Sequence, residues 1–211
     1  MTRLNIIFDF GAVIFGWEPS AFVREVFPQQ ARTDAQARQL ARSIFSHNDW
    51  QSFDAGMLSV HEIVERTYAR TALPLQALGD MVAHIGMRLQ PIPESIQVLS
   101  ELRDRRDAGA DIQLFYLSNM PAPYARVLEK KHDFIGWFDG GIFSGDVKLI
   151  KPDPRIFHMA TQRFGLQAGS RTVFIDDLQT NIDASITHGW RGLHLPSASA
   201  LRSKLFDAIV R

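Results

Sequence analysis

Four short segments of this sequence join polar side chains to apolar stretches, and these polar residues are the ones that could do chemistry. They are IIFDF with Asp9, FYLSN with Ser118 and Asn119, IKPDP with Lys151, and VFIDD with Asp176 and Asp177. Together they offer carboxylates, a hydroxyl and an ammonium group. Such a set suits a phosphoryl group and a hard divalent cation: ammonium and amide groups neutralise phosphoryl oxygens, carboxylates bind the cation, and one carboxylate can attack.

Each segment alone also has an ordinary structural explanation. Asp9 could be a solvent-facing acid at the end of a strand, and the serine and asparagine of FYLSN could cap a helix. Lys151 could be a solvated lysine before a helix that starts at proline. The adjacent acids Asp176 and Asp177 are harder to explain, because neighbouring carboxylates repel each other unless a cation or a donor compensates. The order and spacing of all four segments favour one shared site.

A parallel sheet would bring the four segments together. Beyond residue 90, apolar stretches of strand length alternate with stretches of helical periodicity, which predicts a doubly wound, Rossmann-like parallel sheet of the α/β class. Such sheets bind ligands at the carboxyl ends of their strands. The predicted strands are residues 5–8, 13–15, 112–117, 141–143, 172–175 and 192–195. The predicted helices are residues 94–106, 123–131, 154–164, 181–188 and 198–210.

The segment from about residue 19 to residue 89 has a different character, because its apolar residues recur at helical spacing. Ser59 and Glu62 form a capping box, and Gly56 just before them indicates a turn between helices. We therefore predict two parts. Residues 1–16 and 91–211 form a Rossmann-like catalytic core, and residues 17–90 form an inserted α-helical cap.

The composition is that of a globular protein with a sizeable core. Of the 211 residues, 45% are hydrophobic and 22% are charged, and the formal net charge is zero. A neutral chain has no net field that would gather nucleic acid or an anionic membrane, and the absence of cysteine excludes a thiolate nucleophile or metal site. We expect a cytoplasmic monomer or homodimer that acts on a small molecule, with no nucleic-acid or membrane partner.

With these motifs in hand, the chain resembles the haloacid dehalogenase superfamily of hydrolases over essentially its whole length. The nucleophile, hydroxyl, lysine and acidic-pair motifs of that superfamily occur here in order, and residues 17–90 are similar to its small helical cap. Within the superfamily, the chain looks most like small sugar-phosphate phosphatases that act on glucose 1-phosphate. These also have an Asp-x-Gly first motif, and their caps carry residues similar to Trp50, Asp54 and Gly56.

The resemblance implies a role for each motif residue. Asp9 would attack phosphorus and become an aspartyl-phosphate, which water then hydrolyses. Mg²⁺ would be bound by the Asp9 carboxylate, the Gly11 carbonyl and Asp177, with Asp176 holding a metal-bound water, or with the two acids in exchanged roles. Phosphoryl oxygens would be bound by Ser118, the Asn119 amide and Lys151, which also neutralises the nucleophile. In the cap, Trp50 would bind the face of a small sugar, or, with Phe53, would belong to the cap's own core.

One departure from the family pattern weakens this assignment. Most phosphatases of the superfamily carry a second aspartate two positions after the nucleophile, where it protonates the leaving oxygen, but this chain has Gly11 there. Glu18 is a possible replacement acid. The departure also keeps two alternatives open. One is a 2-haloacid dehalogenase in which Asp9 attacks carbon without a metal, although Asp176 and Asp177 would oppose an anionic haloacid. The other is a non-catalytic phosphate-binding domain.

Overall fold

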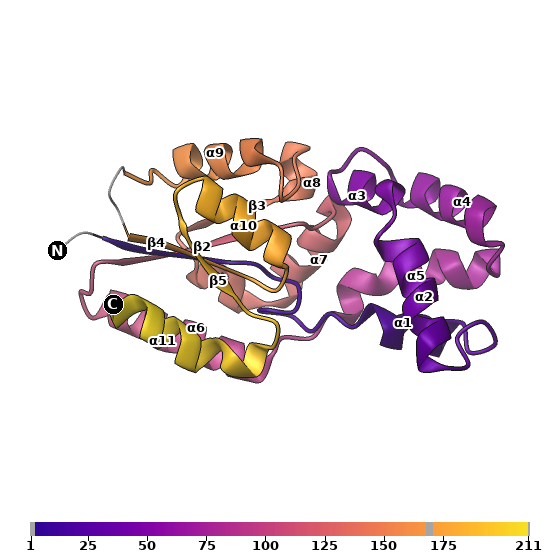
Figure 1. Cartoon of the computed structure of the whole chain (residues 1–211), viewed down its shortest axis with the longest axis horizontal. Coiled ribbons are helices and arrows are strands. Elements are labelled where there is room, and N and C mark those ends of the chain that lie inside the picture. The colour runs from indigo at the N-terminus through magenta and orange to yellow at the C-terminus, as the bar shows by residue number, and fades with distance from the viewer. Residues whose placement is uncertain (1–2, 168–170, 211) are drawn as a thin grey trace.

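The protein is built around a single five-stranded parallel sheet with the strand order β3-β2-β1-β4-β5. The computed structural model in Figure 1 describes residues 3–167 and 171–210. Residues 1–2, 168–170 and 211 of the predicted core lie outside the described residues. The strands are β1 (Leu4–Phe8), β2 (Ile112–Ser118), β3 (Gly140–Phe143), β4 (Arg171–Asp176) and β5 (Arg191–His194). The predicted α/β class and doubly wound sheet are confirmed.

Strand β1 lies in the middle of the sheet and sets the register of the functional residues. Phe8, its last residue, is paired with Tyr116 of β2 on one side and with Ile175 of β4 on the other. Because all three strands run in the same direction, the residues that follow these positions meet at one edge of the sheet. This edge therefore receives Asp9 after β1, and it also receives the last residues of β2 and β4.

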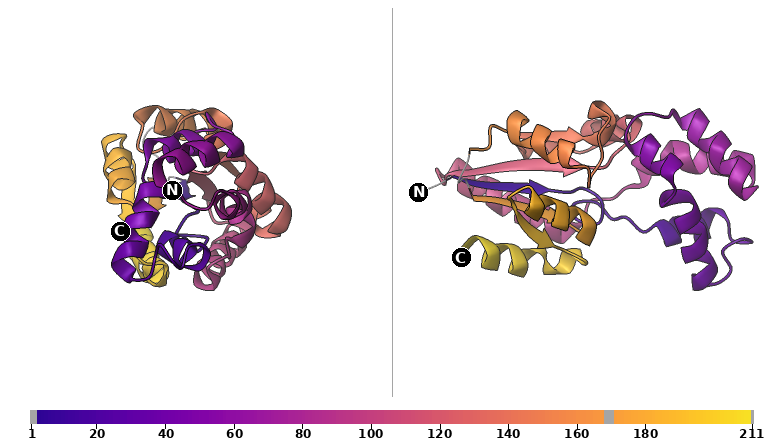
Figure 2. Two further views of the ribbon diagram at one scale, coloured as in Figure 1. Left: turned by 90° about the vertical axis from the view of Figure 1, so that its right-hand side faces the viewer. Right: turned by 45° about the horizontal axis from the view of Figure 1, so that its top comes forward.

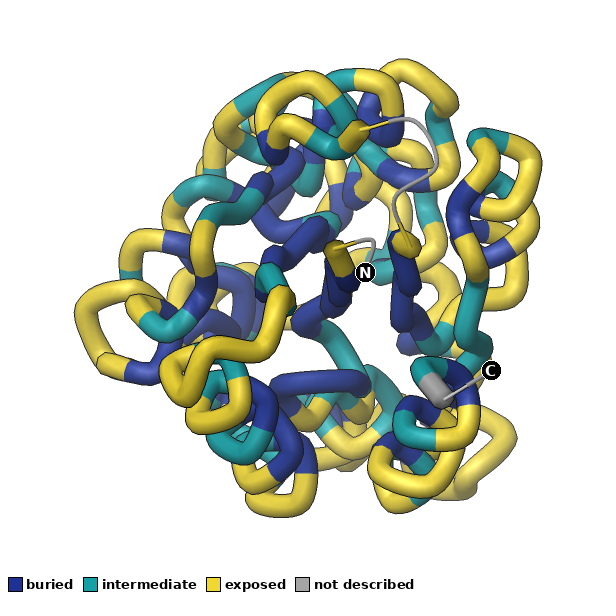
Figure 3. The backbone as a smooth tube through the Cα atoms, turned by 90° about the vertical axis from the view of Figure 1, so that its left-hand side faces the viewer, coloured by how far each residue is buried: buried dark blue, intermediate teal, exposed yellow. Residues whose placement is uncertain are grey.

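Two apolar clusters cover the two faces of the sheet, as alternation along the strands requires. Ile6 and Phe8 of β1 point into one cluster, and Ile7 points into the other. The first cluster is covered by α6 (Pro93–Asp107), α7 (Ala122–Lys131) and α11 (Leu201–Val210), and the second by α9 (Pro154–Arg163) and α10 (Gln179–Thr187). Strand β1 is buried along its whole length, and β2 and β4 are buried up to their carboxyl ends after their first residues, as the dark blue segments inside Figure 3 show.

Five helices form an insert between β1 and α6, at the carboxyl end of the strands (Figure 1; Figure 2, right). They are α1 (Pro19–Val26), α2 (Asp34–Phe45), α3 (Asn48–Asp54), α4 (Val60–Thr71) and α5 (Leu75–Arg88). The predicted Ser59 and Glu62 capping box starts α4. Where the chain enters and leaves the insert, its two segments are hydrogen-bonded: the Gly16 N–H donates to the Gln90 carbonyl at 2.9 Å, and the Ile92 N–H to the Ile14 carbonyl at 2.8 Å.

The predicted strand at residues 13–15 is wrong. This apolar segment forms a turn in which the N–H groups of Ile14 and Phe15 both donate to the Phe10 carbonyl, at 2.9 and 2.7 Å. The turn requires Ala12 to adopt a left-handed conformation with a φ of 55°. Val13, Ile14 and Phe15 are fully buried within the turn, so their apolar character reflects burial and not strand pairing.

Other differences are small. The predicted helix at 198–210 begins with a short 3₁₀ turn, Ala198–Ala200, before α11. The sequence did not predict the 3₁₀ helix η1 (Asp133–Trp137) or the short helix α8 (Ser144–Val147). Among the described residues, no helix is both long and apolar enough to cross a membrane.

Candidate active site

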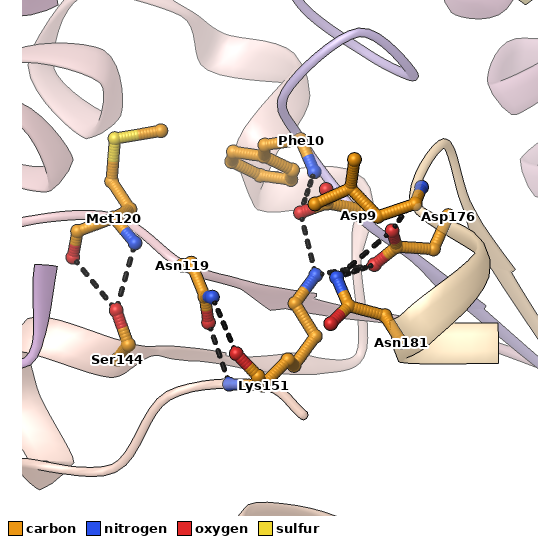
Figure 4. Close-up of polar contacts among 9 residues, drawn as sticks. Asp9, Phe10, Asn119, Met120, Ser144, Lys151, Asp176 and Asn181 are labelled. Atoms are coloured by element: carbon orange, nitrogen blue, oxygen red, sulfur yellow. Dashed lines mark hydrogen bonds and ion pairs between the residues drawn. The ribbon is translucent and has the colours of Figure 1, made fainter. Parts of the chain in front are cut away.

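A buried lysine joins two aspartates at the carboxyl edge of the sheet (Figure 4). The Lys151 ammonium lies 2.9 Å from Asp9 Oδ1 and 2.7 Å from Asp176 Oδ2, and its side chain is 1% exposed. Burial alone would lower the pKa of Lys151, but the two carboxylates outweigh it and raise the pKa above its usual value. The ammonium is therefore a fixed positive charge between β1 and β4.

The segment that carries Lys151 is held by Asn119, which follows β2. The Asn119 side-chain amide donates to the Lys151 carbonyl at 2.9 Å, and its Oδ1 accepts from the Lys151 N–H at 2.8 Å. This pair of bonds links the loop before α9 to the end of the neighbouring strand, as Figure 4 shows. The Asn119 side chain is thus used to position the lysine.

One oxygen of Asp9 is committed to protein donors. Its Oδ1 accepts from the Phe10 N–H at 2.7 Å and from Lys151. Burial, opposed by Lys151 and aided by the charge of Asp176, raises the pKa of the Asp9 carboxyl to about 6. These contacts fix the orientation of the carboxylate, and Asp9 itself lines a cavity.

The acidic pair after β4 divides into a fully buried residue and a partly exposed one. Asp176 accepts hydrogen bonds from the Asn181 side chain at 3.0 Å and from the Leu178 N–H at 2.8 Å, in addition to Lys151. Asp177 lines the cavity instead. Burial, together with the negative charges of Asp9 and Asp176 and against the opposing charge of Lys151, raises the pKa of Asp177 to about 7. Among the described residues, none forms an ion pair with Asp177.

Asp9, Asp176 and Asp177 each offer an oxygen within 4.8 Å of the others. Three carboxylates with one ammonium leave an excess of negative charge in a buried place, which is unfavourable without a further cation. Carboxylate oxygens at this separation suit a hard divalent ion such as Mg²⁺. The residues present therefore fit the predicted metal site, and the neighbouring Gly11 lines the same cavity.

A cavity of about 210 Å³ lies between the sheet edge and the insert. Its polar lining residues are Asp9, Asp54, Asn119, Lys151, Asp177 and Asn181. Most of the remaining lining side chains are apolar or aromatic, namely Trp17, Phe45, Trp50, Ile85, Leu89, Met120, Pro121, Tyr124 and Leu178. The predicted sugar-binding residue Trp50 thus reaches the cavity, although it is 5% exposed and also packs edge-on against Phe45 and Phe53.

Two residues of the sequence-based assignment do not line the cavity. Ser118, at the end of β2, is 1% exposed and is not among the described residues that line the cavity. Glu18 lies at the start of α1 and lines a separate surface depression with Arg88. Asp153, two residues after Lys151, caps α9 through a hydrogen bond from the Arg155 N–H at 2.9 Å.

Sequence reasoning missed the part that Ser144 plays. Its hydroxyl accepts from the Met120 N–H at 2.8 Å and donates to the Asp54 carbonyl at 2.6 Å, so it ties the insert to the loop after β2. Only the small-residue run Ser144-Gly145 hints at a close approach. Position 145 has to be glycine, because a Cβ there would lie 2.4 Å from the Ala122 nitrogen.

Comparison with known proteins agrees with this architecture. A family model for haloacid dehalogenase-like hydrolases matches residues 5–189. The chain belongs to the haloacid dehalogenase-like hydrolase family. The resemblance inferred from the four motifs is thereby confirmed, and the protein is a hydrolase of that family. At the level of sequence, it is 25% identical over 194 residues to a sesquiterpene phosphatase, astK, of Aspergillus oryzae, covering 92% of this chain and 90% of that protein.

Solved structures of this hydrolase family have the same fold. A family enzyme of Bacteroides thetaiotaomicron, bt-2542, superposes with a TM-score of 0.73 at 17% identity, over 98% of this chain and 99% of the other. That enzyme has also been solved in complex with magnesium and inorganic phosphate. An L-2-haloacid dehalogenase of Xanthobacter autotrophicus superposes with a TM-score of 0.67 at 18% identity, over 98% and 83% of the two chains.

Proposed function

We propose that this hydrolase is a Mg²⁺-dependent phosphatase that acts on a small phosphomonoester through an aspartyl-phosphate on Asp9. The observation that carries the proposal is the arrangement of Lys151 between Asp9 and Asp176, with Asp177 beside them on the cavity surface. Displacement at carbon by a dehalogenase needs one carboxylate and no cation site. Two further carboxylates would repel a haloacid anion. A magnesium and phosphate complex of the B. thetaiotaomicron relative supports the same reading.

In this proposal each residue has a definite task. The Asp9 oxygen not committed to Phe10 and Lys151 attacks phosphorus, and the ester oxygen leaves on the opposite side. Lys151 neutralises negative charge on the nucleophile and the phosphoryl group. Asp9, Asp177 and the Gly11 carbonyl would hold Mg²⁺, and Asp176 would support them from its fully buried position. When bound, the cation would neutralise phosphoryl charge and help to orient the ester.

Other residues hold this constellation in place. Asn181 and the Leu178 N–H fix Asp176, while the Asn119 side chain fixes the backbone of Lys151. Backbone N–H groups after β2, including that of Asn119, would bind phosphoryl oxygens, with the Ser118 hydroxyl close by at the end of the strand. We further propose that residues 17–90 act as a cap, because the insert supplies one wall of the cavity and would exclude water from the reaction.

The organic part of the substrate is proposed to be mainly apolar. Among the described residues that line the cavity, those from the insert are Trp17, Phe45, Trp50, Asp54, Ile85 and Leu89, and Asp54 is the only charged one. A sugar needs hydrogen-bonding partners for several hydroxyls, whereas hydrocarbon groups gain free energy from such a surface. The similarity to a sesquiterpene phosphatase supports an apolar group. The sugar phosphate that the sequence predicts is the competing substrate.

The test is phosphate release from a panel of esters, with Mg²⁺ and with a chelator. The panel contains n-alkyl phosphates of increasing chain length, a prenyl monophosphate, glucose 1-phosphate and p-nitrophenyl phosphate. For alkyl esters we expect kcat/KM to rise by up to about fourfold per CH₂, which corresponds to about 0.8 kcal/mol of burial. A preference for glucose 1-phosphate over every alkyl ester would return the assignment to a sugar phosphate.

Two variants control the assay. Asp9→Asn removes the nucleophile and should reduce turnover by on the order of 10⁴-fold or more. Asp183→Asn alters an exposed acid on α10 that is bonded to Gln179, and should leave turnover unchanged. Chelator-resistant halide release from 2-chloropropionate, without any phosphate release, would instead support the dehalogenase. If neither product forms while phosphate still binds, the non-catalytic alternative stands.

A further inference from the structure

The proposed reaction contains one step, protonation of the leaving group, to which no residue has been assigned. The departing ester oxygen of an alkyl phosphate needs a proton, and a general acid contributes on the order of 10²–10⁴-fold to such a step. Gly11 stands where a second acid would be close to the nucleophile, and it has no side chain that could donate. Glu18 faces a different depression. The acid must therefore come from another element.

The insert brings a carboxyl group to the cavity that Asp9 lines. Asp54, the last residue of α3, lines the cavity together with Asp9, Gly11 and Lys151. Within the part of the chain that the structure describes, its carboxylate has no hydrogen bond and no ion pair. Buried carboxyl groups without a cation are rare unless they are protonated. An unpaired carboxyl that faces a reaction cavity is available to a ligand.

The surroundings of Asp54 favour its neutral form. Burial raises the pKa of its carboxyl well above the usual value, and the negative charge of Asp9 raises it further, while Lys151 opposes both. Tyr124 of α7 is the other titratable group near it, and the Tyr124 hydroxyl is occupied in a 2.6 Å hydrogen bond to the Val82 carbonyl. A neutral carboxyl can approach a phosphate ester and donate to it, where a carboxylate would be repelled.

The backbone of Asp54 is fixed against the core. Its carbonyl accepts from the Ser144 hydroxyl, which also binds the Met120 N–H two residues after Ser118. Two residues later, Gly56 has a φ of 65° and lies so close to Gly145 that a Cβ would be 2.3 Å from the Gly145 carbonyl. These contacts hold the end of α3, with Asp54, at a fixed position over the sheet edge, as a group that donates a proton in a reaction must be held.

We propose that Asp54 is the general acid and base of this phosphatase, in the role that Gly11 cannot fill. The inference rests on the proposed function. As the Asp9 oxygen bonds to phosphorus and the P–O bond to the leaving group breaks, the Asp54 carboxyl gives its proton to the leaving oxygen, and the alcohol departs. The resulting Asp54 carboxylate then takes a proton from the water that attacks the aspartyl-phosphate. The P–O bond to Asp9 breaks, phosphate is released, and both side chains return to their initial states.

The test compares esters whose leaving groups differ in their need for a proton. Asp54→Asn keeps the size of the side chain but removes its acidic proton. For an alkyl phosphate we expect kcat/KM to fall by about 10²–10⁴-fold. For p-nitrophenyl phosphate, whose leaving group departs as a stable anion, kcat/KM should fall by less than about tenfold. With this ester the variant should also release a burst of nitrophenolate equal to the enzyme present and then turn over slowly, because the aspartyl-phosphate accumulates.

Two matched variants complete the test. Asp49→Asn alters another acid of α3, one that is paired with Arg66 and Arg70 and does not line the cavity, and should leave both esters unaffected. Asp54→Glu keeps an acid and should recover part of the alkyl ester rate. Equal losses on both esters without a burst would overturn the role of Asp54 while leaving the phosphatase intact. Absence of phosphate release in the wild type would overturn the proposed function itself.

Discussion

The two walls of the cavity differ in almost every physical respect. The sheet wall, formed by Asp9, Lys151, Asp177 and Asn181, is charged, and its members are held by ion pairs, hydrogen bonds and strand register. The insert wall, formed by Trp17, Phe45, Trp50, Ile85 and Leu89, is apolar and held by ring packing and burial. The difference fits the proposed function, in which the sheet would carry the phosphoryl chemistry and the insert would select the organic group.

If that division is right, the largest loss of stability comes from breaking the charge balance of the sheet wall. Lys151→Met leaves Asp9 and Asp176 buried without their counter-charge. We expect the free energy of unfolding to fall by about 3–5 kcal/mol in urea denaturation, together with loss of turnover. The control is Arg126→Met, which removes a half-exposed pair with Asp146 and should cost less than about 1 kcal/mol. Similar costs for both would mean that the buried charges are not interdependent.

The next effect concerns the contact between the insert and the core, where Gly56 approaches Gly145. Gly56→Ala places a Cβ against the Gly145 carbonyl in a left-handed conformation, and should cost about 2–3 kcal/mol while shifting the end of α3 that carries Asp54. Gly79→Ala is the matched control, because a Cβ there meets nothing within 4 Å and α5 should gain about 0.5–1 kcal/mol. Thermal unfolding measures both. A Gly56→Ala protein as stable as Gly79→Ala would show that the close approach is relaxed in solution.

The pH dependence of stability sharpens the description of the sheet wall. Because the pKa of Asp177 rises to about 7 in the folded protein, the folded state binds a proton more tightly than the unfolded state. The contribution of Asp177 to the free energy of unfolding is therefore fully present below pH 4, and it is lost as the pH rises through 7. Without Mg²⁺, Asp177→Asn should therefore be more stable than the wild type at pH 8, by on the order of 1 kcal/mol, but not at pH 4.

The same variant tests the cation site. Mg²⁺ should raise the unfolding temperature of the wild type at pH 8 and have much less effect on Asp177→Asn, since binding to the folded state alone stabilises it. Differential scanning fluorimetry with and without Mg²⁺ measures this. An equal magnesium shift in both proteins would remove Asp177 from the ligand set.

A more selective effect, confined to long substrates, is expected on the insert wall. Trp17 packs against Phe22 and Phe45 and is half-buried at the cavity. Trp17→Gln should lower kcat/KM for the longest alkyl phosphate by about tenfold, or about 1.4 kcal/mol, and leave the shortest ester within about twofold. Equal changes along the series would mean that the alkyl chain does not contact this wall.

The sequence predicts the sheet wall and, in the insert wall, Trp50, but it does not assign the other insert residues to the cavity, for a physical reason. Asp9 and the Asp176-Asp177 pair each follow an apolar strand, so parallel pairing alone brings them together. Asp54 reaches the cavity only through tertiary contacts, the Ser144 hydrogen bond and the approach of Gly56 to Gly145. The segment 13–15 was misassigned because a fully buried turn has the same apolar composition as a strand.

The hydrogen bonds between Gly16 and Gln90 and between Ile14 and Ile92 have an evolutionary consequence. They make the two ends of the helical insert neighbours, so its length can change, or its helices can be exchanged for others, without stretching the strands on either side. If the proposed function holds, a lineage with this arrangement can acquire new substrates by changing the insert, about a third of the chain, while the residues at the sheet edge stay the same. Exchanging residues 17–90 between relatives is thus the recombination that this architecture tolerates.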